Sequence, residues 1–177
     1  TYLDTLDRTQ GLIPEFVNPK YKDSNRDVFK SATRLECMMQ DFPKLLDKDA
    51  KVGFSCYERW FCFSAVKNNI FDAAEKSKSG NSPECAATGE YDIFEANARI
   101  LKMCGASIQG STEEDDKNFQ GIKIRDCAKV FIHPSFGVTL KEIQDKFLGY
   151  CKITKKSIVW LEGEDTYIKD LDLDSTL

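Results

Sequence analysis

Hydrophobic and polar positions divide the first third of the chain into short elements separated by punctuated loops. Residues 1–13 predict a short helix or strand edge, and two prolines mark residues 14–25 as a loop around a short strand. In residues 32–41, leucine and methionine recur at positions i, i+3 and i+4, the spacing of one helix face. We therefore expect a helix there, ended or bent by Pro43.

The middle of the chain combines an aromatic stretch with two helical patterns. Residues 52–66 alternate loosely and are rich in aromatic side chains, which predicts one or two buried strands. A helix is expected to begin within residues 69–78, and the polar composition of residues 76–89 is typical of a surface loop. The apolar positions of residues 90–104 then follow a helix face, with Gly105 as its C-terminal cap.

The pattern changes again in the last third of the chain. An acidic, glycine-bounded stretch at residues 110–121 is typical of an exposed hairpin or connection and lacks the ligand spacing of a calcium loop. From about residue 122 short β-prone pieces dominate, with one short helix expected over residues 138–147. This part is therefore expected to be rich in strands.

Near the C-terminus, apolar residues recur six positions apart. They are Ile153, Val159, Leu171 and Leu177, and the position between the second and the third is Asp165. Short residue repeats of this kind are the signature of a β-helix, but one position breaks the rhythm. An ordinary meander of strands fits the same pattern equally well.

Composition and charge narrow the classes of function. Of the 177 residues, 41% are hydrophobic and 31% are charged, which is usual for a globular protein. The net charge of −4 argues against a protein that binds nucleic acid through the phosphate backbone. The sequence has no run of about 18 apolar residues that would predict a membrane span.

Seven cysteines and a single histidine limit the chemistry further. The cysteines are odd in number and none are spaced C-x-x-C, which argues against a zinc or redox motif and suits a reducing compartment. We therefore expect a cytoplasmic protein. His133 lies in FIHPSFG without a nucleophile elbow, so a serine hydrolase triad is not expected. Chemistry would then depend on lysine, arginine, asparagine and carboxylate side chains.

Two polar clusters flank the helix expected at residues 32–41. Asn18 and Lys20 lie on a loop after a predicted strand, where α/β folds place ligand contacts, although a proline-stiffened turn fits as well. Lys30 and Arg34 would add positive charge at the N-terminus of the expected helix, where free N–H groups bind anions. Glu36 suits the first turn of that helix, and plain helix capping is an equal alternative.

A third cluster ends the aromatic stretch. Lys67 follows FCFSAV directly and precedes two asparagines. A lysine held at the end of a rigid strand can stabilise phosphate oxygens during a transfer reaction, because preorganised charge needs no rearrangement. A surface lysine at a strand end explains the same pattern.

Several blocks of the sequence resemble the later part of the UDP-sugar pyrophosphorylases, which are UTP:sugar-1-phosphate uridylyltransferases. The blocks are EFVNPKYKD (15–23), FKSATRLECMMQDFPK (29–44), VGF (52–54) and FSAVKNN (63–69). EYDIFEANARIL (90–101) and SIVWLEGEDTYIKDLDLD (157–174) fit the same family in order and spacing. The resemblance covers nearly the whole chain.

The resemblance implies an enzyme that converts UTP and a sugar 1-phosphate into a UDP-sugar and pyrophosphate with Mg²⁺. In that reaction a sugar phosphate oxygen attacks the α-phosphorus of UTP, and catalysis consists of positioning and charge neutralisation. Lys67 matches the strand-end lysine of the family that contacts the nucleotide phosphates, which makes it the implied catalytic residue. The implied substrate-binding residues are Asn18, Lys20, Lys30, Arg34 and Glu36. No residue of the chain is assigned to the metal, whose ligands are expected mostly elsewhere.

The implied fold is α/β. Residues 1–106 would form the later part of a Rossmann-like, GT-A-like nucleotidyltransferase domain, and residues 107–177 a truncated, β-rich, β-helix-like C-terminal domain. The glycine-rich nucleotide loop and the uracil-reading segments of the family are absent from the sequence. We therefore expect a C-terminal fragment that is inactive alone and needs the missing N-terminal part of the same enzyme.

Three alternative functions stay open at this point. UDP-glucose or UDP-N-acetylglucosamine pyrophosphorylases of the same superfamily share the NPK block and a strand-end lysine. A non-catalytic binding or regulatory module could retain the same fold. A structural β-helix interaction domain would require the six-residue rhythm to continue beyond the end of this chain.

Overall fold

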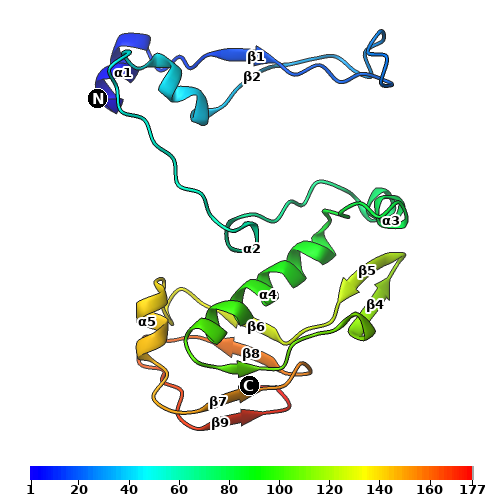
Figure 1. The fold of residues 1–177 in the computed structure, drawn as a ribbon, viewed down its shortest axis with the longest axis vertical. Coiled ribbons are helices and arrows are strands. Elements are labelled where there is room, and N and C mark those ends of the chain that lie inside the picture. Colours follow the sequence, from blue (N-terminus) through cyan, green and yellow to red (C-terminus); the bar gives the residue numbers. More distant parts are fainter. Residues whose placement is uncertain (177) are drawn as a thin grey trace. The chain divides into compact units, whose positions relative to one another are not determined.

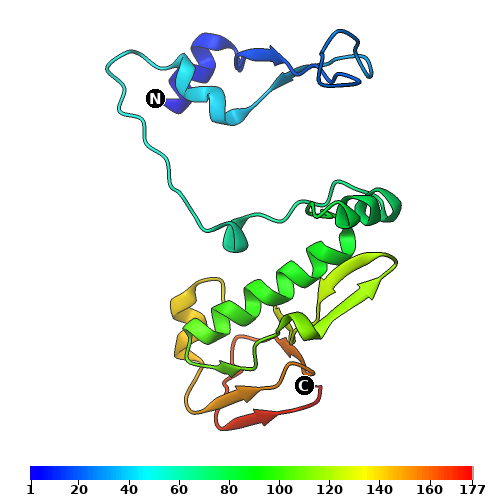
Figure 2. The ribbon, with the colours of Figure 1, turned by 45° about the vertical axis from the view of Figure 1, so that its right-hand side comes forward.

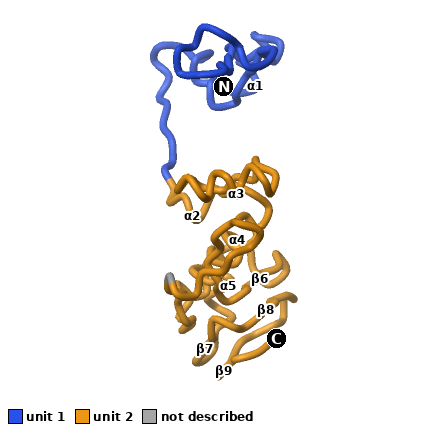
Figure 3. Tube along the Cα trace, turned by 90° about the vertical axis from the view of Figure 1, so that its right-hand side faces the viewer, with its two compact units in different colours: residues 1–56 blue, residues 57–177 orange. Residues whose placement is uncertain are grey.

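The computed structural model describes residues 1–176, except for the side chain of Glu113, and these residues form two compact units (Figure 3). Unit 1 comprises residues 1–56, and unit 2 begins at residue 57. Both contain helices and small sheets, so the expected α/β class is confirmed. Within the described part of the chain, no helix has the length and apolarity needed to cross a bilayer.

Unit 1 is built from one helix, a two-stranded sheet and a 3-10 helix. These elements are α1 (Tyr2–Thr9), β1 (Glu15–Val17), β2 (Leu35–Cys37) and η1 (Met39–Leu45). Helix α1 ends as expected near Gly11, because Gln10 and Gly11 both take positive φ angles, 54° and 77°. The Arg8 guanidinium donates to the Leu45 carbonyl at 2.7 Å and ties α1 to η1.

The prediction of a helix over residues 32–41 is wrong. The chain there forms β2, which pairs antiparallel with β1 so that Glu36 lies opposite Phe16. Leu35, Met38 and Met39 are spaced as on one face of a helix, but all three side chains are exposed and pack against no core. A pattern of apolar residues favours a helix only where a core covers that face, and here pairing with a distant strand decides the conformation.

Unit 1 has almost no interior. Thr5 is its only buried residue, and none of residues 1–56 buries a hydrophobic side chain. Apolar contact is limited to pairs such as the rings of Tyr2 and Phe42, whose centroids lie 4.8 Å apart. So little apolar burial cannot offset the conformational entropy of ordering 56 residues.

Unit 2 holds the remaining elements (Figure 1). Its helices are α2 (Arg59–Cys62), α3 (Ile70–Lys78), α4 (Ala86–Met103), η2 (Glu113–Asp115) and α5 (Leu140–Asp145). Its strands are β3 (Ser107–Ile108), β4 (Asp116–Phe119), β5 (Ile122–Arg125), β6 (Lys129–Ile132), β7 (Cys151–Ile153), β8 (Ile158–Leu161) and β9 (Leu171–Leu173).

The three longer helices of unit 2 confirm their capping signals, but the surface loop expected over residues 76–89 is shorter than expected, because α3 extends to Lys78 and α4 begins at Ala86. Asn69 caps α3 by accepting from two backbone N–H groups, and Thr139 with Glu142 forms a capping box on α5. Helix α4 ends at Met103 with Cys104 as its C-cap, and Gly105 follows with a φ of +101°. The N–H of Ala106 donates to the Leu101 carbonyl, which is the Schellman arrangement that Gly105 predicts.

Parallel strands form the β-rich part of unit 2. Strands β3, β7 and β9 form one parallel sheet, in which Ile153 lies between Ile108 and Leu173, and β6 pairs parallel with β8 in a second sheet. Figures 1 and 2 show α4 lying along these sheets. Leu101 of α4 shares one hydrophobic core with Val130 of β6 and with the buried strand residues.

The six-residue rhythm is only partly visible in this stack. Ile153 and Val159 are buried as expected, whereas Leu171 is half-buried. The partner stacked on Ile153 is Leu173, not Leu171, so the repeat is not a regular multiple of six. Leu177, the last member of the predicted series, lies outside the described residues.

The acidic stretch at 110–121 leads into an antiparallel hairpin, β4–β5, as expected. The alternating burial of β5 places Ile122 and Ile124 against α3, where they form a second small core with Ala73 and Cys85. Hairpin and helix thus share an interior separate from the main core.

The prediction of one or two buried strands over residues 52–66 is wrong. The structure assigns only the four-residue helix α2 to this stretch. Its aromatic side chains are exposed, with Phe54 at 95%, except for Trp60, which is half-buried. Val66 packs on α4 at Gly89, where a Cβ atom would come within 2.8 Å of its side chain. Among the described residues no strand pairs with this stretch, so it lacks the hydrogen bonds that define a strand.

The domain boundary expected between residues 106 and 107 stays a prediction. The division into compact units falls instead after residue 56, and α4 and the strands that follow it share one core.

Candidate functional site

The predicted substrate-binding residues all lie on the basic hairpin, by which we mean β1, β2 and the loop 18–34 between them. The backbone N–H of Lys30 donates to the carbonyl of Lys20 at 2.7 Å. One step further along the loop, Tyr21 and Phe29 form an isolated bridge, and their rings stack at 5.3 Å between centroids. The structure therefore brings Lys20 and Lys30 together on opposite arms of the loop.

Positive charge gathers on this loop. Residues 18–34 contain five basic and two acidic side chains, whereas the whole chain carries a net charge of −4. All five basic side chains are exposed. Among the described side chains, Lys20, Lys30 and Arg34 form no ion pair. An exposed, locally cationic loop attracts phosphate groups, so the arrangement suits an anionic ligand.

The helix-terminus explanation for Lys30, Arg34 and Glu36 is wrong. No helix begins at these residues: Arg34 precedes β2, and Glu36 lies within it. Glu36 therefore has no capping role, and no free helix N–H groups are available here to bind an anion. Asn18, the first residue after β1, is exposed at the base of the loop.

Lys67 lies in unit 2, on an extended segment immediately before α3. The N–H groups of Lys67 and Asn68 both donate to the Glu84 carbonyl, at 2.8 Å and 3.0 Å. Two residues later, the Asn69 side chain accepts from the N–H groups of Phe71 and Asp72. The backbone is thus held on both sides of Lys67 while its side chain is exposed.

The residue that sequence reasoning missed is Glu84. Its φ of +48° turns its carbonyl towards the segment of Lys67, and its carboxylate lies 3.8 Å from Arg59 and 3.6 Å from Lys76. Glu84 sits in a polar loop of ordinary composition, so the sequence carries no signal of this role. The structure places Lys67 and the residues of the basic hairpin in different units.

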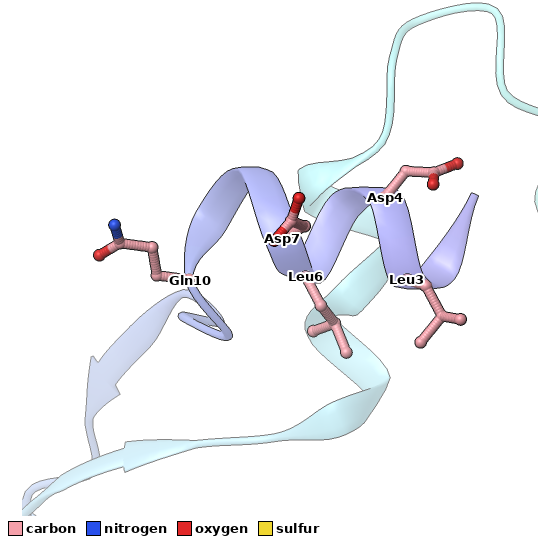
Figure 4. A pocket seen from close by; sticks show the side chains of 5 residues that line it. All are labelled: Leu3, Asp4, Leu6, Asp7 and Gln10. Atoms are coloured by element: carbon pink, nitrogen blue, oxygen red, sulfur yellow. The ribbon is translucent and has the colours of Figure 1, made fainter.

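A depression along α1 is the other feature of unit 1 (Figure 4). It is lined by Leu3, Asp4, Leu6, Asp7 and Gln10, which all belong to α1 or to its C-terminal cap. Because no second element converges on it, the depression offers no enclosed contacts to a ligand.

The described residues offer no ready-made metal centre. Among the side chains that the structure describes, which leave out Glu113, no group of three or more from histidine, cysteine, aspartate and glutamate is placed to hold a metal ion. Magnesium is often bound by only one or two carboxylates together with substrate phosphates.

Known proteins similar to this chain are UDP-sugar pyrophosphorylases. Those of Arabidopsis thaliana, Oryza sativa subsp. indica and Oryza sativa subsp. japonica are 41%, 40% and 39% identical to it over 176 residues. Each match covers 99% of this chain but only 28% of the relative's length. No protein-family model matches the chain. The resemblance seen in the sequence blocks is confirmed, with a coverage consistent with a C-terminal part of such an enzyme.

Proposed function

We propose that this chain is the C-terminal part of a UDP-sugar pyrophosphorylase. The enzyme would transfer the uridylyl group of UTP to a sugar 1-phosphate. A phosphate oxygen of the sugar 1-phosphate forms a bond to the α-phosphorus, and pyrophosphate leaves with the electrons of the broken α–β bridge. The observation that carries the proposal is the identity of about 40% to three such enzymes across 176 residues.

Within this function the basic hairpin would bind substrate phosphate. Both substrates are polyanions, and charge-assisted hydrogen bonds to phosphate are among the strongest that side chains make. Lys20 and Lys30 are held side by side by their backbone hydrogen bond, so they can act on one phosphate group. Arg34 would add a planar fork of donors. Asn18 would donate to or accept from sugar hydroxyls, the Glu36 carboxylate would accept from them, and both would shape the pocket.

Lys67 would be the catalytic residue. Charge that develops on the phosphate oxygens in the transition state is stabilised best by a cation that is already in place. The hydrogen bonds from Lys67 and Asn68 to Glu84 fix the backbone at this position, and the capped N-terminus of α3 follows directly. Bound Mg²⁺ would supply further charge neutralisation to the UTP phosphates, and no residue of this chain is assigned to it.

The function also requires more of the enzyme than this chain. Unit 1 buries no hydrophobic side chain, and the stretch from Phe54 to Phe71 exposes one aromatic ring after another. Large exposed apolar surfaces mark contacts with other protein. We propose that both surfaces pack against the N-terminal part of the same enzyme, which would complete a Rossmann-like, GT-A-like domain. The parallel stack of β3, β7 and β9 would be the start of its β-helix.

The proposal is tested by assaying the chain with and without the rest of the enzyme. The 177-residue chain, mixed with UTP, glucose 1-phosphate and Mg²⁺, is expected to release no pyrophosphate. The longer polypeptide that contains it is expected to do so. Turnover by the chain alone would contradict the proposed incompleteness of the site. A longer polypeptide that binds UTP but never turns over would favour the non-catalytic module instead.

A further inference from the structure

The proposed catalytic lysine belongs to residues 64–68, an extended stretch that we call the lysine segment. The segment is attached at both ends to α4 or to the loop before it. At its start, the Ser64 hydroxyl donates to a carboxylate oxygen of Asp92 on α4, at 2.8 Å. At its end, the N–H groups of its last two residues share the carbonyl of Glu84, which precedes α4. The start of α4 therefore determines where the backbone of the lysine segment lies.

Between these two attachments, the lysine segment contacts α4 at Gly89. This glycine is buried within the helix, so its conformational freedom does not explain its presence. A Cβ atom at Gly89 would lie only 2.8 Å from Cγ2 of Val66, whereas carbon atoms in contact prefer about 3.5–4.0 Å. Valine is restricted in χ1 and cannot turn aside easily. The absence of a side chain at Gly89 thus lets the segment approach the helix this closely.

The side chain of Asn68 adds a third hydrogen bond at the end of the segment. Its Nδ2 donates to the Pro83 carbonyl at 2.7 Å, next to the Glu84 carbonyl that receives the two backbone N–H groups. Asn68 is half-buried, and the Glu84 carboxylate in turn lies 3.6 Å from the Lys76 ammonium. Two consecutive residues of the segment are thus joined to two consecutive carbonyls of a loop that is itself tied to α3.

We propose that Gly89 and Asn68 are positioning residues for uridylyl transfer. They would act by fixing the backbone from which the Lys67 ammonium reaches the transferred phosphate. The inference rests on the role of Lys67 in the proposed function, and it assigns neither residue a contact with substrate. A lysine side chain is flexible, so its placement depends on a fixed backbone. A displacement of about 1 Å in a catalytic site can lower a rate about a hundredfold.

The role of Gly89 is tested by the turnover of the longer enzyme that contains this chain. In Gly89→Ala the new Cβ atom should displace Val66 and the lysine that follows it, which should lower kcat at least about threefold with KM little changed. Alanine favours a helix more than glycine does, so α4 should persist by circular dichroism. Gly110→Ala is the control and should turn over normally, because nothing lies within 4 Å of a Cβ atom there.

A compensating substitution separates this contact from other effects of the alanine. Val66→Ala removes the methyl group that the new Cβ atom would meet. The double variant Val66→Ala/Gly89→Ala should therefore turn over faster than Gly89→Ala. A double variant as slow as Gly89→Ala would overturn the role of Gly89.

Asn68→Ala tests the other positioning residue without adding any atom. It removes the hydrogen bond to Pro83, so kcat should fall at least about threefold with KM little changed. Asn81→Ala is the control, because Asn81 is an exposed asparagine in the same loop as Pro83, and it should turn over normally. An Asn68→Ala enzyme with the kcat of this control would overturn the role of Asn68.

The same substitutions in a Lys67→Ala background distinguish positioning from a general loosening of the fold. Residues that act only through the lysine should have almost no further effect once it is gone, because effects within one functional unit are not additive. Equal factors in both backgrounds would overturn the positioning role and leave the proposed function intact. A near-normal kcat of Lys67→Ala itself would instead overturn the proposed function, and the inference with it.

Discussion

Leu101 is the residue on which the packing of α4 against the parallel strands depends most. Its side chain is 0% exposed and lies in the core that joins α4 to β6. Replacing it with alanine removes buried methyl groups and leaves a cavity, which costs about 2–5 kcal/mol in protein cores. We expect about 3–5 kcal/mol, because the surroundings cannot easily close the gap. The Asn97 side chain fixes α4 to the Val130 carbonyl at 2.9 Å, and Gly105 fixes the end of the helix.

Urea unfolding followed by tryptophan fluorescence reports the unfolding of unit 2, because both tryptophans, Trp60 and Trp160, belong to that unit. A loss of this size should lower the urea midpoint by about 1–5 M, for urea slopes of about 1–3 kcal/mol per M. Met103→Ala on the same helix is the control; that side chain is 58% exposed, so its loss should cost at most about 0.5 kcal/mol. A Leu101→Ala cost below about 1 kcal/mol, or equal to the control, would refute the packing described for α4.

Two further predictions concern the same unit. Gly105→Ala forces an alanine to a φ of +101°, so it should lower the free energy of unfolding by about 1–3 kcal/mol in urea titrations, whereas Gly53→Ala, with no positive φ, should change it little. Asp115 pairs with Lys155, chiefly through a hydrogen bond that lowers the pKa of the carboxyl to about 2. Its contribution to stability is therefore present above about pH 4 and lost as the pH falls towards 2. Unfolding measured against pH should show an advantage over Asp115→Asn at pH 6 that shrinks below about pH 4 and is mostly lost by about pH 2, the pKa of the folded state; a pH-independent difference would contradict this.

Local signals were enough to predict the helices of unit 2. The cap residues Asn69 and Thr139 and the glycine at Gly105 act within a few residues of the helix ends they define. The strands with alternating burial, such as β5, also carry their pattern in their own sequence. These elements could be predicted because the interactions that define them join residues close together in the sequence.

The elements that were missed depend on distant partners. Residues 35–37 form a strand because β1 lies beside them, and nothing in their own spacing indicates this. The aromatic stretch before Lys67 has the composition of a strand but no neighbouring strand among the described residues. The candidate site is divided in the same way, since Lys67 and the basic hairpin lie in different units and Glu84 reaches Lys67 only through the fold.

The most direct measurement of the proposed function is the turnover of the longer enzyme with Lys67→Ala. Loss of a fixed cation at the transferred phosphate should lower kcat by at least about tenfold, with the fold unchanged by circular dichroism. Lys78→Ala, an exposed lysine on α3 that pairs with Glu75, serves as the control and should turn over normally. A Lys67→Ala enzyme that keeps a near-normal kcat would contradict the proposed role of Lys67 in uridylyl transfer.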